Sequence, residues 1–270
     1  MGRALRDIRT QRGETQKDVG AKVGFSYSKL SRVESGIHDF KPRDIHRLLN
    51  AYGVVDPDER GRLVRLAEEA NEGAWWRPWK DVATKQAISH VSFESMAQRV
   101  RSYEPAHLSG LLQIADYARA VISGGPEVPA DAVDRLVELR LERQRQMWET
   151  PKKLIFIIDE LTLVRGMGNP DVMRRQLSHL IELSEDPRYV FQVLELGTFN
   201  VPSFLGVTTI FDFAEQALPD IVYVEGLEGA QYLQDEGQVD VRKRMFDRAR
   251  SISLERSRSV QRMRDLLKRS

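Results

Sequence analysis

We predict a multi-domain protein, in which an all-α N-terminal domain of five short helices precedes a mixed α/β domain. Apolar residues recur at helical spacing over residues 1–71, whereas residues 153–158 ("KLIFII") and 189–196 ("YVFQVLEL") have the patterns of strands. Three of the four tryptophans fall within residues 71–80, where the first pattern ends. We therefore expect domains at residues 1–71 and 85–270, joined by a Trp-rich junction at residues 72–84.

Four of the five helices expected in the first domain have start or stop signals of their own. These signals are a capping box at Thr15 and Asp18, a left-handed stop at Gly24, a cap at Ser26, a stop at Gly36, and helix starts at Pro42 and at Asp56-Pro57. Within the third helix, Leu30 and Val33 have the spacing of inward-facing residues.

The second domain mixes the two kinds of pattern. We expect further strands at residues 206–213, 221–225 and 230–233, helices at 110–122, 130–149 and 170–184, and one or two basic helices within 238–269. No internal repeat is present.

Charge varies strongly along a chain whose net charge is only +1. Residues 1–52 contain 11 Lys and Arg against 6 Asp and Glu, and residues 242–270 contain 11 against 3, whereas the middle of the chain is acidic. Basic ends suggest contact with a polyanion. The absence of cysteine, of a signal-peptide core and of an apolar run of about 18 residues predicts a cytoplasmic protein without a membrane span.

Residues 15–34 have the pattern of a helix-turn-helix, in which small polar residues open the second helix. A helix that enters the major groove, about 12 Å wide, needs an exposed face that is polar and not acidic. The residues expected on that face are Ser26, Tyr27, Ser28, Lys29, Ser31 and Arg32. The alternative is that this face is only the solvated side of a small helical bundle.

Each side chain offers a specific contact to DNA. Arg32 can donate two hydrogen bonds to a guanine edge, Ser28 can donate or accept, and Tyr27 can contact a thymine methyl or a phosphate. Gln16 and nearby backbone N–H groups are placed to hold a phosphate. We predict DNA contacts from six residues: Gln16, Ser26, Tyr27, Ser28, Lys29 and Arg32.

Residues 5–54 resemble the repressor-type helix-turn-helix family called Cro/C1 or XRE, which has a lambda repressor-like fold. The features that carry this resemblance are Arg9, Thr15-Gln16, Gly24, Ser26 and the run "SRVESG". The resemblance implies a salt bridge between Arg9 and Glu34 that holds the first helix to the recognition helix. Gly20 replaces the alanine usual in the family, which lowers helix stability by up to ~1 kcal/mol.

Residues 102–121 ("SYEPAHLSGLLQIADYARAV") resemble the signature of the DUF5753 domain, which is common in actinobacterial regulators. The segment "IIDELTLVRGMGN" and later segments follow in that domain's order. Ser109 and Val164 stand where the family usually has proline and arginine. Proteins that join these two domains are WhiJ-like transcriptional regulators, and the resemblance implies a small DUF397-type protein as a partner.

Together the two resemblances predict a sequence-specific DNA-binding transcriptional regulator and not an enzyme. Because one recognition helix reads only a few base pairs, we expect a homodimer on a palindromic operator of double-stranded DNA. The C-terminal domain is expected to sense a small protein or ligand, and the protein to join the nucleoid when bound to DNA. The alternative is a DNA-binding antitoxin whose α/β domain neutralises a small partner encoded next to it.

Other patterns indicate structure more than chemistry, and we predict no catalytic residue, metal or cofactor. Asp159 and Glu160 follow a strand and are expected to cap or begin the next helix rather than to form a catalytic pair. Gly166 and Gly168 lack the GK[ST] of a phosphate loop and indicate a turn. The histidines lack metal-ligand spacing: His38, His46, His90, His107 and His179.

Two segments leave alternatives open. We expect Trp75, Trp76 and Trp79 to pack in a core, and the alternative is that they form a ligand cage. The basic tail from Arg242 has apolar residues at helical spacing, including Met263, which favours packing on the body or on a second subunit. Its alternative is nonspecific contact with phosphates.

Overall fold

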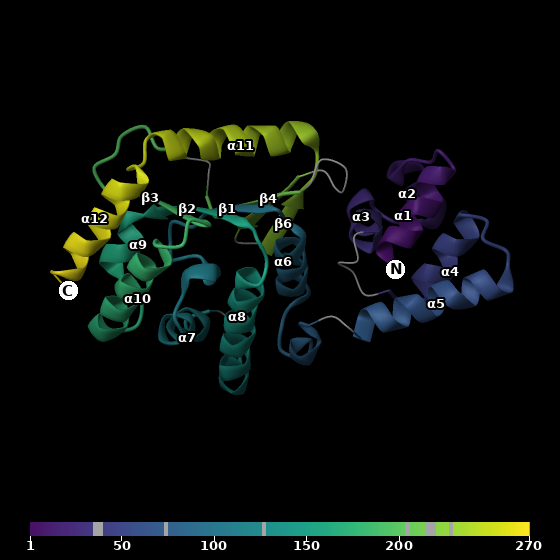
Figure 1. The fold of residues 1–270 in the computed structure, drawn as a ribbon, viewed down its shortest axis with the longest axis horizontal. Coiled ribbons are helices and arrows are strands. Elements are labelled where there is room, and N and C mark those ends of the chain that lie inside the picture. Colours follow the sequence, from purple (N-terminus) through teal and green to yellow (C-terminus); the bar gives the residue numbers. More distant parts are fainter. Residues whose placement is uncertain are drawn as a thin grey trace. The chain divides into compact units, whose positions relative to one another are not determined.

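The computed structural model of this chain describes residues 1–34, 40–72, 75–125, 128–202, 206–213, 220–226 and 229–269. Within them the chain divides into two compact units, the first ending at Lys80 and the second beginning at Asp81. This division lies inside the expected junction at residues 72–84. Figure 1 shows a purely helical first unit and a second unit built on a sheet, as the sequence predicts.

The described part of the first unit contains a 3-10 turn at Arg77–Trp79 and five α-helices: α1 (Gly2–Gln11), α2 (Gln16–Val23), α3 (Tyr27–Glu34), α4 (Pro42–Ala51) and α5 (Pro57–Glu72). Their apolar faces meet in one core, in which Leu5, Val19, Leu30, Ile45 and Tyr52 are fully buried. The five-helix prediction is therefore confirmed.

The local signals read from the sequence are present in this unit. Thr15 and Asp18 form both halves of a capping box, and Gly24 ends α2 with φ 63°. The Ser26 hydroxyl accepts the Lys29 N–H at 3.2 Å, and Pro42 opens α4. The expected stop at Gly36 lies outside the described residues.

The second unit contains a six-stranded mixed sheet of order β3-β2-β1-β4-β5-β6. Its strands are β1 (Arg99–Tyr103), β2 (Lys153–Asp159), β3 (Tyr189–Leu194), β4 (Thr208–Asp212), β5 (Ile221–Gly226) and β6 (Gly229–Leu233). Strands β1, β2 and β3 run parallel, and β4, β5 and β6 pair antiparallel to their neighbours. The expected strands are confirmed, but the sequence did not predict β1, which is a central strand with two arginines.

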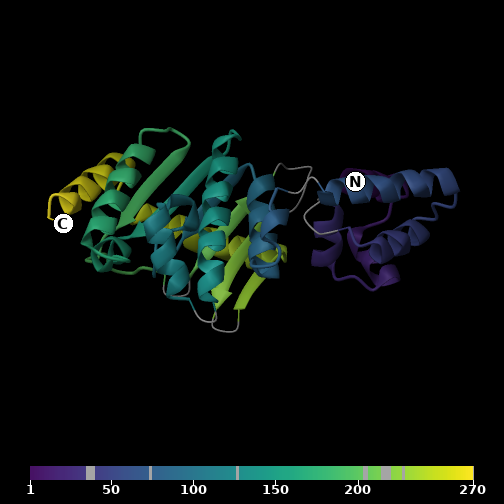
Figure 2. The ribbon, with the colours of Figure 1, turned by 90° about the horizontal axis from the view of Figure 1, so that it is seen from below.

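Helices cover both faces of this sheet (Figure 1). They are α6 (Lys85–Met96), α7 (Ala115–Ser123), α8 (Val133–Trp148), α9 (Glu160–Arg165), α10 (Pro170–Leu183), α11 (Glu236–Ser251) and α12 (Arg256–Leu267). Helix α11 lies on one face, while α6, α7, α8 and α10 lie on the other, where Figure 2 shows them over the strands. No helix of the described residues is long and apolar enough to span a membrane.

The basic tail forms two helices that pack on the body of the second unit. Val239, Phe246 and Ala249 of α11 join the core above the sheet. In α12, Met263 is fully buried, and the helix packs against α10 and β3. The interpretation of the tail as packing helices is confirmed.

The helix expected at residues 110–122 is shorter than predicted, because α7 begins only at Ala115. Residues Gly110–Leu112 form a 3-10 turn, and Gln113 is extended. The side chain of Gln144 donates to the carbonyl oxygens of Gly110 and Gln113, and the Ile114 N–H donates to Gln176. These side chains bind backbone groups that a continuous helix would bond internally.

Candidate nucleic-acid interface

The turn between α2 and α3 brings the second helix of the motif onto the first. Gly24 takes the left-handed conformation that ends α2, and the Phe25 N–H donates to the Gly20 carbonyl at 2.8 Å. Helix α3 then packs against both α1 and α2, with Leu30 and Val33 buried. Tyr27, Lys29 and Arg32 of α3 keep part of their surface exposed to solvent.

Gly20 is explained by the same turn. A Cβ atom at this position would lie 2.8 Å from the carbonyl oxygen of Phe25, which is closer than backbone atoms allow. The alanine usual in the resembling family would therefore have to displace this turn. The glycine costs helix propensity of about 1 kcal/mol and permits the close approach.

A buried ion pair joins α3 to α1. Arg9 donates from Nε and Nη2 to the two carboxylate oxygens of Glu34, at 2.7 and 3.0 Å. The hydrogen bond to Glu34 raises the pKa of Arg9 above its usual value. The structure thus brings together the two residues that the family resemblance pairs.

Two further donors complete the environment of Glu34. The Gln16 amide donates at 2.9 Å and the Tyr52 hydroxyl at 3.1 Å. Burial, together with the charge of Glu34, raises the pKa of Tyr52, so its hydroxyl stays a protonated donor. Glu34 is the only acidic residue of α3, and its carboxylate is buried, so the exposed side of this helix has no negative charge.

The residues predicted to contact DNA differ in how far they are exposed to solvent. Ser26 is exposed, and Tyr27 is 41% exposed, with a pKa raised by partial burial. Gln16, Lys29 and Arg32 are half-buried. Ser28 lies in α3, but its side chain is outside what the structure describes.

Ser31 corrects the sequence analysis, which expected it on the exposed face. In the structure Ser31 is buried, with only 1% of its surface exposed. Because α3 packs against both α1 and α2, its buried face is wider than the stripe of Leu30 and Val33 alone. Only the tertiary arrangement of three helices determines this width.

Lys29 is held by its neighbours. Its ammonium lies 2.8 Å from the Asp44 carboxylate of α4 and 3.7 Å from the centre of the Phe25 ring. These contacts fasten α3 to α4. A base contact from Lys29 would require its release from Asp44, which its half-buried position makes costly.

Arg47 is a basic residue beside the motif that sequence reasoning missed. Its guanidinium lies 5.4 Å from the Phe25 ring, and its Nη2 is 3.2 Å from the Cβ position of Gly24. The side chain of this α4 residue is exposed. The sequence signal was only an exposed position on an amphipathic helix, and its place at the turn follows from the packing of α4 on α2.

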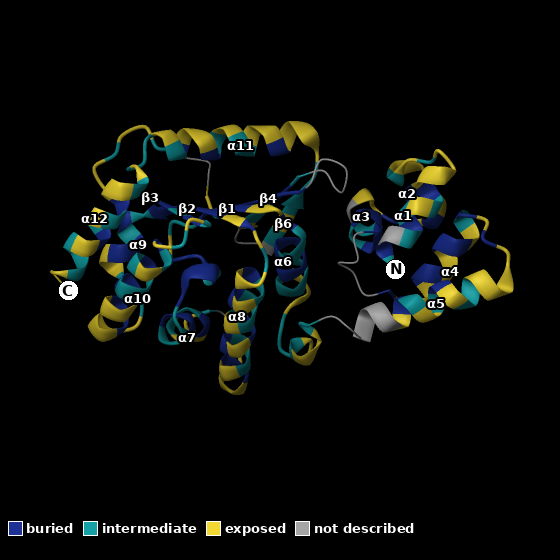
Figure 3. Ribbon diagram, in the orientation of Figure 1, coloured by how far each residue is buried: buried dark blue, intermediate teal, exposed yellow. Residues whose placement is uncertain are grey.

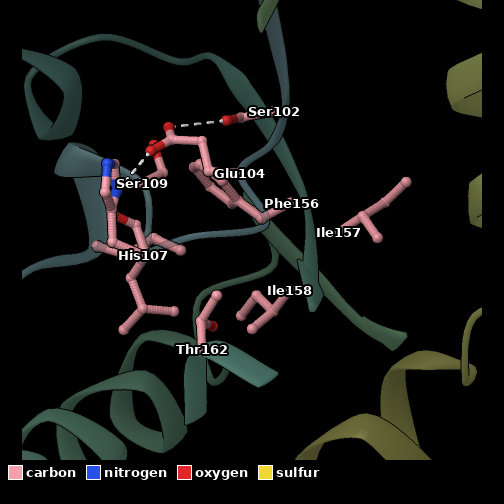
Figure 4. Close-up of a pocket in the computed structure, with 10 residues that line it drawn as sticks. Ser102, Glu104, His107, Ser109, Phe156, Ile157, Ile158 and Thr162 are labelled. Atoms are coloured by element: carbon pink, nitrogen blue, oxygen red, sulfur yellow. Dashed lines mark hydrogen bonds and ion pairs between the residues drawn. The ribbon is translucent and has the colours of Figure 1, made fainter. Parts of the chain in front are cut away.

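The second unit has a small pocket at the carboxyl ends of β1 and β2 (Figure 4). Its cavity volume is only about 10 Å³, roughly the room that one water molecule needs, and its polar lining is Ser102, Glu104, His107, Ser109 and Thr162. His107 Nδ1 lies 3.0 Å from the Glu104 carboxylate, which also accepts the Ser102 hydroxyl at 3.2 Å.

The two charged groups of this pocket satisfy each other. Burial alone would raise the pKa of Glu104, but the hydrogen bond and charge of His107 hold it below its usual value. The same hydrogen bond raises the pKa of His107. This arrangement fits an ion pair that fastens the segment after β1.

The other patterns singled out in the sequence have structural roles. Asp159 caps α9 by accepting the Leu161 N–H at 3.0 Å, as predicted, and the buried Glu160 accepts the Leu196 N–H at 3.0 Å. Gly166 and Gly168 have φ of 66° and 76° in the connection between α9 and α10, which confirms a turn.

The tryptophans and histidines also have identifiable surroundings. Trp75 packs edge-on against Trp76 and Trp79, with ring centres 5.7 and 6.3 Å apart, and all three are half-buried. The structure brings no three His, Asp or Glu side chains into a metal-binding group within the described residues. His38 lies outside those residues.

The first unit therefore has the helix-turn-helix geometry of a DNA-binding regulator, joined to a mixed α/β unit. Comparison with known families agrees: residues 1–63 match the helix-turn-helix domain, and residues 88–265 match the domain of unknown function DUF5753. The second match spans more than half of the chain, so the protein belongs to the DUF5753 family. No curated protein and no solved structure matches the chain.

Proposed function

We propose that this protein is a sequence-specific transcriptional regulator of the WhiJ-like type, with α3 as the recognition helix in the major groove. The observation that carries the proposal is the burial of Glu34. Arg9, Gln16 and Tyr52 bind the only carboxylate of α3, so the groove-facing side presents hydroxyls and cations to the DNA.

The side chains divide into two roles in this proposal. Arg32 and Ser28 read base edges, with Tyr27 and Ser26 beside them at the start of α3. Gln16 contacts a phosphate through the N-terminus of α2, where backbone N–H groups favour an anion. Arg47 adds a phosphate contact beside the turn, and Lys29 contributes mainly by fastening α3 to Asp44.

The protein acts as a homodimer on a palindromic operator in the cytoplasm of an actinobacterium, joining the nucleoid when bound to DNA. Two copies of α3, one turn of DNA apart, double the number of base pairs read. The α/β domain responds to a small partner, for which the family resemblance suggests a DUF397-type protein. A regulator of this kind requires no cofactor.

Selection of binding sites from a pool of random DNA duplexes tests the proposal. Wild-type protein should enrich one palindromic site, and Arg32→Ala should lose discrimination at one position per half-site, by about 1–3 kcal/mol. Gln16→Ala should weaken binding to all sequences without changing the preferred site. Fluorescence anisotropy on the selected duplex measures both effects.

Arg62→Ala is the matched control, because Arg62 is an exposed arginine of α5 outside the motif. It should leave the selected site unchanged. If Arg32→Ala and Ser28→Ala both select the wild-type site with wild-type affinity, α3 is not the recognition helix.

A further inference from the structure

Helix α8 carries a stripe of exposed residues, two of which also contact neighbouring elements: Asp134 pairs with Arg119 of α7, and the Trp148 indole N–H donates to the Tyr189 hydroxyl at 2.6 Å. The stripe consists of Asp134, Glu138, Leu141, Arg145 and Trp148, all of which are exposed, whereas the opposite side of α8 packs into the unit. Leu141 is 37% exposed and Trp148 46% exposed. Figure 3 shows exposed residues recurring along this helix.

The spacing of the α8 stripe is that of a helix–helix seam. Its members follow one another at alternating intervals of four and three residues, which keeps them on one line when two helices pair. Trp and Arg are also enriched where protein interfaces are most buried. An exposed leucine and tryptophan on such a line indicate an interaction surface.

The order of charges indicates which partner fits. In an antiparallel pair of α8 helices with a twofold axis near Leu141, the two leucines meet on the axis. Glu138 then lies opposite Arg145 of the second copy, and Arg145 opposite Glu138. A parallel pair would instead oppose like charges at both positions, so the stripe is complementary to itself only when antiparallel.

Both charged residues are available for this pairing. Glu138 makes no ion pair within the described part of the chain. Arg145 is bound by Glu142 and Glu149 of its own helix, but its side chain is 56% exposed, and such surface pairs stabilise little. Arg145 can therefore exchange one of these two carboxylates for Glu138 of a second copy.

We propose that the α8 stripe is the surface through which two copies of this chain associate, antiparallel about an axis near Leu141. The inference rests on the dimer of the proposed function and names its interface. One pair of helices about 24 Å long buries less than the roughly 1,200–2,000 Å² of stable complexes. The dimer is therefore weak in solution and is reinforced when both copies bind one operator.

Disulfide cross-linking tests the position of the axis, because the full-length chain contains no cysteine. L141C places two thiols across the axis, so under mild oxidation it should form a covalent dimer about tenfold faster than the controls. The controls are V164C on α9 and V241C on α11, whose native side chains are 55% and 46% exposed. Equal rates for L141C and the controls would overturn the proposal.

Charge reversal tests the pairing independently, with self-association of the full-length chain measured by sedimentation. E138R and R145E should each weaken association about tenfold, and the double variant E138R/R145E should restore it, because two opposite-charge contacts form again. R244E on the exposed side of α11 is the control and should have no effect. Unchanged association in both single variants, or a monomeric wild type, would contradict the assignment of the α8 stripe as the dimer interface.

Site selection separates this inference from the proposed function. If wild-type protein selects a palindromic site while L141C cross-links no faster than its controls, the α8 surface is wrong and DNA reading stands. If L141C cross-links rapidly while no sequence is enriched, the surface stands and the proposed function fails.

Discussion

Each unit of this protein pairs a buried carboxylate with arginine, and the two sites differ in how far apart the paired residues lie in the sequence. Arg9 and Glu34 are 25 residues apart and join two helices of one motif. Arg101 and Asp212 are 111 residues apart and join β1 to β4, with distances of 2.6 and 2.9 Å between their paired atoms. The chemistry is the same, but only the first pair belongs to a local motif.

The two carboxylates also have different neighbours. Glu34 is neutralised by one arginine and accepts hydrogen bonds from two neutral donors, and these contacts hold α3 in place within the first unit. Asp212 is bound by Arg99 and Arg101, and these arginines hold its pKa below the usual range although burial opposes this. The first pair joins α1 to α3, whereas the second joins the adjacent strands β1 and β4.

The largest effect is expected when Glu34 is removed. Glu34→Ala leaves Arg9 buried without its carboxylate and leaves Gln16 and Tyr52 without an acceptor, which should cost the first unit about 4 kcal/mol. Urea unfolding followed by circular dichroism measures the loss, and DNA binding should fall with it. Glu14→Ala, which removes the exposed pair with Lys22, should change stability by less than about 1 kcal/mol.

Asp212→Ala should be the next most costly change, at about 3 kcal/mol, because it leaves the buried Arg101 with only the longer contact to Asp247, at 3.5 Å. The loss should appear only in the unfolding of the second unit. Calorimetry resolves the two units if they unfold separately. Asp171→Ala is the exposed control, and an equal shift in the first unit would contradict the separation of the two sites.

Tyr52→Phe removes one donor from Glu34 and keeps the ring packed. The loss of a hydrogen bond to a charged group should cost about 1.5 kcal/mol, less than the loss of the carboxylate itself. The free energy of unfolding in urea measures this difference. A loss as large as that of Glu34→Ala would show that Tyr52, and not Arg9, dominates the cluster.

The smallest effect concerns the Glu104–His107 pair, whose cation is a histidine with a raised pKa and not an arginine. The pKa of His107 is higher in the folded protein than its usual value of 6.5. The stability that protonated His107 contributes is therefore fully present below pH 6.5 and is lost as the pH rises through the folded-state pKa. His107→Gln should flatten this dependence. Unfolding measured from pH 5.5 to about 8.5 compares the two proteins, and identical profiles would assign the dependence to another group.

Local sequence signals determined much of this protein. The caps at Thr15 and Ser26 and the left-handed stop at Gly24 depend on residues within a few positions of one another, so their spacing predicted the helix-turn-helix. The inward positions of Leu30 and Val33 in α3, and strands β2 to β6 of the second unit, followed from their apolar patterns. The pairing of Arg9 with Glu34 was expected from the family resemblance, whereas its distances come from the fold.

Only the tertiary structure decided the features that depend on distant segments. Strand β1 was missed because its arginines have the composition of a surface strand, and Asp212 becomes their partner only when β4 pairs beside them. Ser31 is buried because two helices converge on α3, and Lys29 is held because α4 places Asp44 beside it. Helix caps are contacts between near neighbours in the chain, whereas burial and ion pairing depend on which distant segments the fold brings together.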